Sequence, residues 1–488
     1  MKTVTINPIT RLEGHGKISI FLNDEGNVEN AYFQVPELRG FEKFCEGRPV
    51  EEMPDITSRI CGVCPEAHHI ASTKALDGVF HVEPPPAAKK LRELLYSAFF
   101  VADHITHFYV LAGPDFVMGP TAPKAERNIL SVIAKVGLEV GSSVIKHRSD
   151  ALDAIAMIGG KRIHPSCGVP GGVSKSIDED ERVKIETIAE SEVEFAKFTM
   201  KLFDDIVLNN KDYVSLITSE TYATETYYMG TVDDQNRVNF YDGKIRVVDP
   251  EGKEFAKYAP VDYQQHIAEH VEPWTYLKYP YLKKIGWKGL IGGKNSGIYR
   301  ATPLARLNVA EGMTTPVAQA EYRRMYETLG RKPIHATLAT HWARLVELVY
   351  AAERMLELSR DPEITSPNVR TIPTSIPDEG VGAVEAPRGT LIHHYKTDEK
   401  GIVKGVNLIV ATTNNHAAIS MSIKQAAQGL IKKGDVSDGI LNMVEMAFRA
   451  YDPCFACATH TLPGQMPLDV KIYSKNGLLL QTLRRPEF

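Results

Sequence analysis

Apolar residues recur with helical spacing along much of the chain. From residue 87 to residue 111 they fall three or four positions apart, which is typical of a helix that buries one face. The positions are Leu91, Leu94, Leu95, Ala98, Phe99, Ala102 and Ile105. The same spacing predicts further helices over residues 125–158, 179–208, 318–329, 335–358 and 436–451.

A different texture predicts short strands. Residues 17–22 and 28–35 are rich in apolar and β-branched side chains, and the turn-forming residues 23–27 separate them. Strand-like segments that alternate with turns also predict small sheets at three further places: residues 222–287, residues 389–412, and the tail after residue 460, where Asn476-Gly477 would form the turn.

These patterns predict a mainly α fold with small peripheral β-sheets (α+β), built on a central bundle of long helices. The predicted segments are a β-rich N-terminal part (1–50), a helical core (51–220), a partly β insertion (221–300), a second helical core with a hairpin (301–460) and a C-terminal extension (461–488).

Composition narrows the class of protein. The chain has 488 residues, of which 43% are hydrophobic, so it can bury a large core. The net charge is −5 and no block of Lys and Arg stands out, which argues against a nucleic-acid partner. We expect no membrane span, because no apolar run approaches about 20 residues. The N-terminus has no apolar signal core, so the chain is expected to be cytoplasmic.

Four of the six cysteines form two C-x-x-C pairs at opposite ends of the chain. Cys61 and Cys64 make the first pair, and Cys454 and Cys457 make the second. Thiolates are soft ligands that suit nickel, iron, copper(I) or zinc. A histidine follows each pair and can orient a thiolate or bind the metal. The pattern predicts one metal site that joins the two ends.

Spacing alone leaves the metal open. Four thiolates are also the ligand set of a structural zinc site. Zinc ribbons usually keep their pairs within a few tens of residues, however, and a chain of this size needs no zinc staple to fold. A dithiol redox pair is a further option, but it explains only one of the two motifs.

The strings around these cysteines resemble a known family. RICGVCPEAHH and YDPCFACATH are similar to the paired signatures of nickel–iron hydrogenase large subunits. PITRLEGHG, LRGFE, HFYVLAGPDF and VEAPRGT resemble other segments of that family, in the same order, so the resemblance spans residues 8–460. HHYKTDEKG and VATTNN look like the cytoplasmic, bidirectional, NAD-linked group, including its electron-bifurcating relatives.

The resemblance implies a hydrogenase that cleaves H2 reversibly and heterolytically at a Ni–Fe centre. Cys61 and Cys454 would be terminal nickel ligands, and Cys64 and Cys457 would bridge nickel to iron. The iron would also carry CO and two cyanides. Such chemistry is reasonable for a Lewis-acidic metal that works beside a base.

Charged residues near the metals also match the family. Glu13 would relay protons, although a lone glutamate beside a strand is otherwise a surface charge. Arg388 would lie above the open metal position, held by Asp115 and Asp452. The alternative for Arg388 is an ordinary salt bridge to Glu385. For Asp452 the alternative is a turn before Pro453.

Further residues match contacts of the cofactors. His68 would hydrogen-bond the bridging sulfur of Cys457. Thr412 would donate to an iron-bound cyanide, with Pro387 as a second cofactor contact, although Ala411 departs from the proline that the family often has. Glu42 and His460 would bind Mg2+, for which histidine is an unusual ligand.

The remaining cysteines, Cys45 and Cys167, cannot hold a four-cysteine Fe–S cluster. The resemblance therefore implies a small subunit that carries Fe–S clusters, further flavin and Fe–S subunits that reduce NAD, and ferredoxin as a candidate acceptor. A maturation protease would cut after His460 and remove residues 461–488. The alternatives are a zinc-binding scaffold and a non-catalytic relative in respiratory complex I, a lineage that has lost the cysteines.

Overall fold

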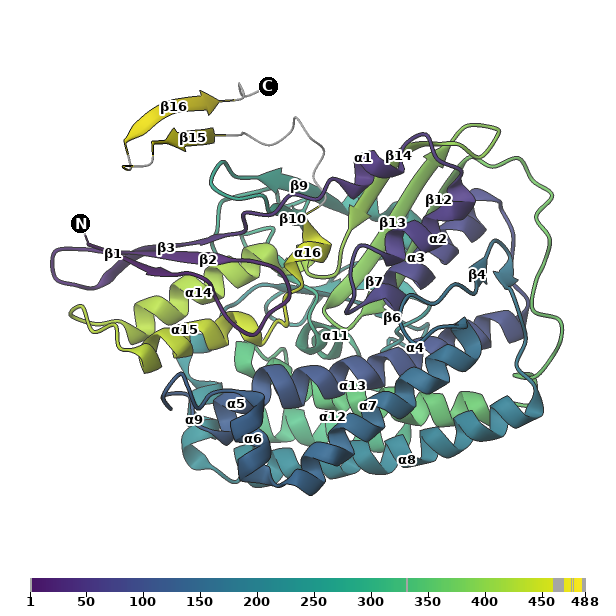
Figure 1. The fold of residues 1–488 in the computed structure, drawn as a ribbon, viewed down its shortest axis with the longest axis horizontal. Helices are drawn as coiled ribbons and strands as arrows, with labels where there is room; N and C mark the ends of the chain where they lie inside the picture. The colour runs from purple at the N-terminus through teal and green to yellow at the C-terminus, as the bar shows by residue number, and fades with distance from the viewer. Residues whose placement is uncertain (1, 331, 460–468, 475, 477, 485–488) are drawn as a thin grey trace.

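The computed structural model describes residues 2–488 apart from 331, 460–468, 475, 477 and 485–488. Long helices form a block along one side of the molecule (Figure 1). They are α4 (Pro86–Thr106), α7 (Leu138–Gly159), α8 (Glu179–Phe203), α12 (Pro316–Leu329) and α13 (Thr340–Ser359). Pro84 and Pro85 precede α4 and Pro86 opens it, and a capping box between Asp178 and Glu181 sets where α8 begins.

The remaining helices lie outside this block. They are α1 (Phe41–Cys45), α2 (Met53–Ser58), α3 (Pro65–Val79), α5 (Gly113–Val117), α6 (Ile129–Val136), α9 (Lys211–Thr218), α10 (Tyr263–His266), α11 (Pro303–Val309), α14 (His416–Leu430), α15 (Asp438–Arg449) and α16 (Phe455–Ala458). The helix predicted over residues 125–158 is wrong in one respect. It is divided into α6 and α7 at Gly137, whose φ of 98° ends the first helix.

Six small sheets make up the β structure among the described residues. Their strands are β1 (Lys2–Ile6), β2 (Lys17–Leu22), β3 (Val28–Gln34), β4 (Gly168–Val169), β5 (Gly172–Val173), β6 (Tyr227–Val232), β7 (Lys244–Val248), β8 (Glu254–Tyr258), β9 (Ile267–Val271), β10 (Lys278–Leu282), β11 (Tyr299–Arg300), β12 (Glu379–Ala386), β13 (Gly389–Thr397), β14 (Val403–Ile409), β15 (Asp469–Tyr473) and β16 (Leu479–Arg484). β1–β2–β3 and β12–β13–β14 are antiparallel meanders, and β11 joins β6 in parallel.

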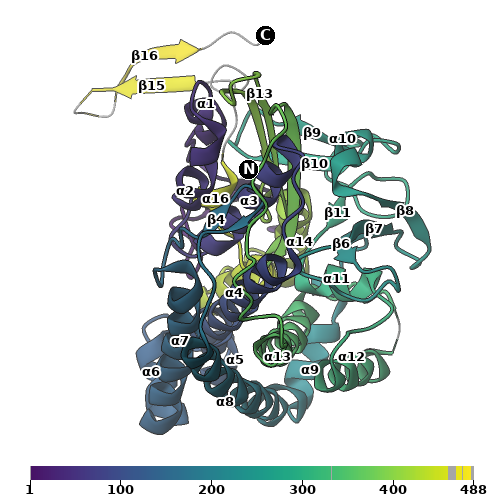
Figure 2. The same ribbon diagram turned by 90° about the vertical axis from the view of Figure 1, so that its right-hand side faces the viewer.

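The sheets lie around the helices as predicted. Figure 2 shows β6, β7 and β8 on the side of the molecule away from α6 and α7. β2 has the predicted bounds, and β13 and β14 lie where the hairpin was expected. The mainly α fold with small peripheral sheets is therefore confirmed.

Close packing of α3 on β12 positions the first C-x-x-C motif. A Cβ added at Gly382 would lie 2.1 Å from the Ala71 carbonyl oxygen, so only glycine allows the strand to approach this helix so closely. α3 begins directly after Cys64. The close contact of α3 with β12 therefore fixes the position of the first C-x-x-C motif relative to the β12–β13–β14 sheet.

The expectation that no apolar run could span a membrane is wrong for one helical stretch. Residues Pro86–Val117 are long and apolar enough by length and composition. However, 78% of the most apolar window of this stretch is buried inside the protein, where it packs against α7 and α13. It therefore has the character of a core helix.

Candidate metal centre

The four motif cysteines meet in the buried interior, although they come from opposite ends of the chain. The Sγ atoms of Cys61 and Cys454 are 3.4 Å apart, and those of Cys64 and Cys457 are 3.5 Å apart. All four sulfurs lie within 4.8 Å of one another, and each residue is at most 6% exposed. We call this set the four-cysteine cluster. No disulfide joins them.

Helix starts place these sulfurs. Cys64 precedes α3 and Cys454 precedes α16, so each has a non-helical backbone that turns its side chain out of the helix that follows. The Cys61 sulfur accepts a hydrogen bond of 3.1 Å from the Val63 amide. The predicted meeting of the two motifs is therefore confirmed.

The cluster has the electrostatics of a metal site. Hydrogen bonds from the neighbouring thiols hold the pKa of Cys61 well below its usual range. Burial raises the pKa of Cys454 and of Cys457. Four cysteine thiols this close together cannot all ionise unless a cation lies between them, because the negative charges repel one another. Soft thiolate donors in a buried pocket therefore fit a metal of the nickel, iron or zinc type.

Glu13 belongs to this cluster and not to the surface. Its Oε2 atom accepts hydrogen bonds from the Cys454 thiol at 3.0 Å and from the Ala456 amide at 3.1 Å. The Glu13 carbonyl also accepts from the Phe455 amide at 3.0 Å, and the two segments form a short parallel bridge. Burial raises the pKa of Glu13, so the carboxyl can exchange a proton with the sulfur beside it.

We expect Gly14→Ala to disturb this contact. Gly14 has a φ of 86°, and a Cβ there would lie 2.9 Å from the Ala456 backbone nitrogen. The strained backbone costs about 1 kcal/mol, and the clash adds to it by pushing the Glu13 segment away. Gly47→Ala is a matched control, since Gly47 has a φ of 83° and open space around it. H2 turnover should fall in Gly14→Ala and stay normal in Gly47→Ala; equal turnover in both would contradict this role.

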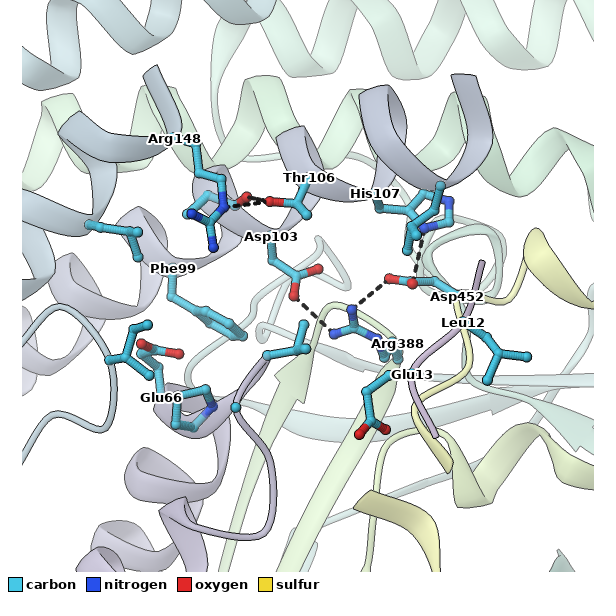
Figure 3. Close-up of a pocket in the computed structure, with 17 residues that line it drawn as sticks. Leu12, Glu13, Glu66, Phe99, Asp103, Thr106, His107, Arg148, Arg388 and Asp452 are labelled. Carbon is cyan, nitrogen blue, oxygen red and sulfur yellow. Dashed lines mark hydrogen bonds and ion pairs between the residues drawn. The ribbon is translucent and has the colours of Figure 1, made fainter. Parts of the chain in front are cut away.

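A cavity of about 290 Å³ lies beside Glu13. Figure 3 shows the Arg388 guanidinium in it, between Asp103 and Asp452. Arg388 Nη1 is 2.9 Å from Asp103 Oδ2, and Nη2 is 2.9 Å from Asp452 Oδ2. All three side chains are at most 5% exposed. The cavity therefore holds a fixed positive charge next to the four-cysteine cluster.

Titration of the two aspartates differs. Burial raises the pKa of Asp103 to about 6. Burial acts the same way on Asp452, but Arg388 and His107 outweigh it and hold the pKa of that carboxyl below its usual range. His107 Nδ1 lies 3.0 Å from Asp452 Oδ1. Asp103 is thus the more readily protonated partner of the arginine.

The expectation that Asp115 holds Arg388 is wrong. Asp115 Oδ2 is 3.0 Å from Arg449 Nη1, and its Oδ1 atom pairs with Arg11. Asp103 takes the expected place, one helix earlier. Asp115 instead ties the N-terminal segment that carries Glu13 to α5 and α15. The alternative pairing of Arg388 with Glu385 is also not found, because Glu385 pairs with Arg306.

Asp115→Asn should therefore destabilise the protein more than it affects catalysis. Burial acts to raise the pKa of Asp115, but Arg449 and Arg11 outweigh it and keep the pKa low. Its contribution to stability is complete above the ordinary pKa of the carboxyl and is lost progressively as the pH falls from there through the lowered pKa of the folded protein. We expect a loss of about 3 kcal/mol, because the buried Arg449 and the partly buried Arg11 lose a charged partner. Thermal unfolding measures this loss. If Asp115→Asn unfolded as wild type does but lost turnover, Asp115 would have a role at the metal centre instead.

His68 does not make its expected contact. Its Nδ1 atom lies 3.0 Å from His393 Nε2, and no hydrogen bond to the Cys457 sulfur is present between these described residues. The buried Nε2 atom of His68 has no hydrogen-bond partner in the described part of the chain. Burial lowers the pKa of His68 to about 4, so the imidazole is neutral.

The other predicted contacts are placed as follows. Thr412 Oγ1 accepts a hydrogen bond of 3.1 Å from the backbone amide of Cys454, one of the four cysteines. The Pro387 carbonyl accepts from Arg306 at 3.1 Å, which fixes the turn before Arg388. Glu42 is buried and faces the Lys278 ammonium, 3.4 Å from its Oε1 atom. His460 lies outside the described residues.

Sequence patterns missed two functional candidates. Asp103 and His107 are polar residues within the long apolar pattern of residues 87–111, and spacing gave no reason to prefer them to Asp115. Two further buried polar residues lie nearby: His104 hydrogen-bonds Glu347, and Glu347 pairs with Arg306. The available signal was their position on the predicted buried face of the helix, where a charged residue needs a partner.

The comparisons with known proteins agree with this site. A family model described as nickel-dependent hydrogenase matches residues 39–139 and 278–460, and one described as HoxL-like matches residues 3–38. The chain is 52% identical to an iron-sulfur subunit of the F420-non-reducing hydrogenase from Archaeoglobus profundus, over 99% of this chain and 100% of that one. It is 35% identical to the beta subunit of the NAD-reducing hydrogenase HoxS from Cupriavidus necator, with the same coverage.

Solved structures give the same result. A crystal structure of an NAD+-reducing NiFe-hydrogenase in the H2-reduced state has a TM-score of 0.88 and 35% identity, covering 94% of this chain and 100% of that one. The Ni-Fe-Se hydrogenase of D. vulgaris Hildenborough, 23% identical with a TM-score of 0.76, shares the fold; the match covers 94% of this chain and 100% of that one.

The chain therefore belongs to the nickel-dependent hydrogenase family. Within that family it is a large subunit of the nickel–iron type, an enzyme of H2 metabolism with the motif cysteines at its centre.

Proposed function

We propose that the four-cysteine cluster holds the Ni–Fe centre, with Cys61 and Cys454 as terminal nickel ligands and Cys64 and Cys457 as bridges to iron. The iron would carry CO and two cyanides, with Thr412 and Pro387 near them. The observation that carries the proposal is the convergence of four buried thiols within 4.8 Å. Such a centre, when bound, supplies the Lewis acid and electron acceptor for heterolytic cleavage of H2.

Glu13 would move the proton. The Cys454 sulfur lies 3.0 Å from Glu13 Oε2, which is a hydrogen-bond distance, so a proton on that sulfur would pass directly to the carboxylate. The half-buried carboxyl, with its raised pKa, can accept this proton and release it toward the surface. In the reverse direction, the same pair delivers a proton to the centre.

Arg388 would polarise the space in which H2 reacts. Its guanidinium is fixed in the cavity by Asp103 and Asp452, so a positive charge is in place before substrate arrives. A preorganised charge in a water-poor pocket stabilises developing charge more than a mobile one does. The cavity wall also includes the exposed apolar residues Val63 and Ile163, which frame its mouth.

This cavity favours catalysis over a structural zinc site. A structural zinc site is closed by four protein ligands and needs no adjacent cavity. Here the half-buried Glu13 carboxyl hydrogen-bonds Cys454 of the cluster, and Glu13 and Arg388 line a cavity beside it. The non-catalytic complex I alternative is disfavoured because all four cysteines are present.

Electrons would leave through an iron–sulfur small subunit. Relatives are named as subunits of hydrogenases, which implies such a partner. We propose that flavin and Fe–S subunits then pass electrons to NAD, with ferredoxin as a second acceptor in an electron-bifurcating complex. Relatives named F420-non-reducing share more identity with this chain than the NAD-reducing one does. Assays of the purified complex with NAD+, ferredoxin and F420 under H2 separate these acceptors.

Two further assignments complete the proposal. Glu42 would bind Mg2+ together with His460. The whole hydrogenase complex would be located in the cytoplasm. The Lys278 ammonium faces the same carboxylate and would have to move for the ion to bind. A maturation protease would cut after His460 and remove the C-terminal extension. Figure 1 shows β15 and β16 outside the body formed by the other elements, which supports this cut.

Metal content tests the proposed function. Protein purified from its native source with its partners should contain one nickel per large subunit, and iron beyond the needs of the partner clusters. H2 turnover should follow the nickel content. Zinc without nickel, in a complex that retains all subunits, would identify the four cysteines as structural.

A further inference from the structure

A second cluster of metal-binding side chains lies between α7 and α8, away from the four-cysteine cluster. It contains His147 and Asp150, three residues apart on α7, and Glu192 on α8. One ligand atom from each lies within 4.8 Å of the others, and His147 Nδ1 is 3.1 Å from Glu192 Oε1. Figure 1 shows the two helices running side by side. Spacing of three residues puts both α7 donors on one face of the helix.

Glu192 has too few partners for its burial. The residue is 1% exposed, and its Oε2 atom has no hydrogen-bond partner in the described part of the chain. Burial raises the pKa of this carboxyl. A second carboxylate, Asp150, faces the same space, and its ammonium partner Lys146 lies on the solvent side. A buried carboxylate with an open oxygen beside a second carboxylate calls for a positive charge between them.

The imidazole is held ready to take part. The His147 ring stacks on Phe195 of α8, with ring centroids 4.0 Å apart and planes 10° apart. This contact holds the plane of the ring, and the hydrogen bond to Glu192 directs its Nδ1 atom into the cluster. Asp150, whose side chain is 25% exposed, leaves a path for an ion from solvent.

We propose that His147, Asp150 and Glu192 bind a divalent cation of borderline softness, with zinc as the best match. Imidazole nitrogen and carboxylate oxygen are both zinc ligands, and three protein ligands leave one position for water. Ligand atoms of a tetrahedral zinc site lie about 3.3 Å apart, so the present cluster needs only a small contraction.

The ion would join α7 to α8 next to the active-site cavity. Arg148 and Leu152, on the same helix α7, line that cavity. Arg148 also donates to Thr106 of α4 at 2.9 Å. A metal at this position would therefore brace the cavity wall without touching the four-cysteine cluster.

Zinc binding by the purified complex, with its partner subunits, tests the proposal. After dialysis against a chelator, zinc is titrated by calorimetry and bound metal is counted by mass spectrometry. Wild type should bind about one more zinc per large subunit than Glu192→Gln, because the amide keeps the shape but loses the charge. His147→Gln should lose the same ion. Glu190→Gln, an exposed change two residues away on α8, is the matched control and should bind as wild type does.

Nickel content separates this proposal from the proposed function. It should be the same in all four proteins, so a zinc difference cannot come from the four-cysteine cluster. Equal zinc binding by wild type, Glu192→Gln and His147→Gln would overturn the proposal. The cluster would then be held by the hydrogen bond between His147 and Glu192 alone.

Discussion

Cys454→Ala is expected to abolish H2 turnover while the chain still folds. Turnover should fall below about a thousandth of the wild-type rate, because the metal that supplies the chemistry loses a ligand. Cys454 is 1% exposed, lies 3.4 Å from the Cys61 sulfur and donates to Glu13, so one change removes several contacts of the site. The loss of one sulfur atom from a large core leaves only a small cavity, which costs about 1 kcal/mol.

Nickel analysis, H2 uptake with an artificial acceptor and circular dichroism measure this result together. Cys45→Ala is the matched control, since Cys45 is an equally buried free thiol outside the four-cysteine cluster. It should keep nickel and turnover. If Cys454→Ala retained wild-type turnover, Cys454 could not be a nickel ligand.

Glu13→Gln should slow proton exchange by about 100-fold or more and leave the metals bound. The amide can still accept from the Ala456 backbone, so the local structure is preserved, but it cannot take a proton from the Cys454 sulfur. Loss of a positioned acid–base group typically costs a factor of this size.

Exchange of D2 with solvent protons, followed by mass spectrometry, measures the effect. Glu25→Gln is the control, since this residue lies in the exposed turn between β2 and β3. Unchanged exchange in Glu13→Gln, with nickel content equal to wild type, would rule out a relay through this carboxyl.

Local patterns predicted much of the secondary structure. The period of the apolar residues placed α4, α8 and α13, and turn residues placed the β2–β3 hairpin. These signals are local, because a helix or hairpin depends on neighbouring residues. The break at Gly137 was missed, since apolar spacing continues through it and only the backbone conformation reveals the division.

The sequence predicted the type of site, but it did not predict every residue that pairs with Arg388. Asp115 lies within the HFYVLAGPDF string and Asp103 lies just before it, so either could be assigned to Arg388 from sequence. The structure pairs Asp103 with Arg388 and gives Asp115 to Arg11 and Arg449. Which of the two aspartates contacts Arg388 depends on how each helix is oriented when it packs. The spacing of residues within one segment does not specify that orientation.

The sequence by itself determined the class of chemistry, since two C-x-x-C motifs and the strings around them indicate the candidate metal ligands and the family. Tertiary structure alone decided how those residues cooperate. It brought Glu13 to 3.0 Å from Cys454, set Arg388 between two aspartates, and left an oxygen of Glu192 without a partner among the described residues between α7 and α8. The physical reason is that ligand type is a property of single side chains, whereas distance, burial and charge balance arise only when distant segments pack together.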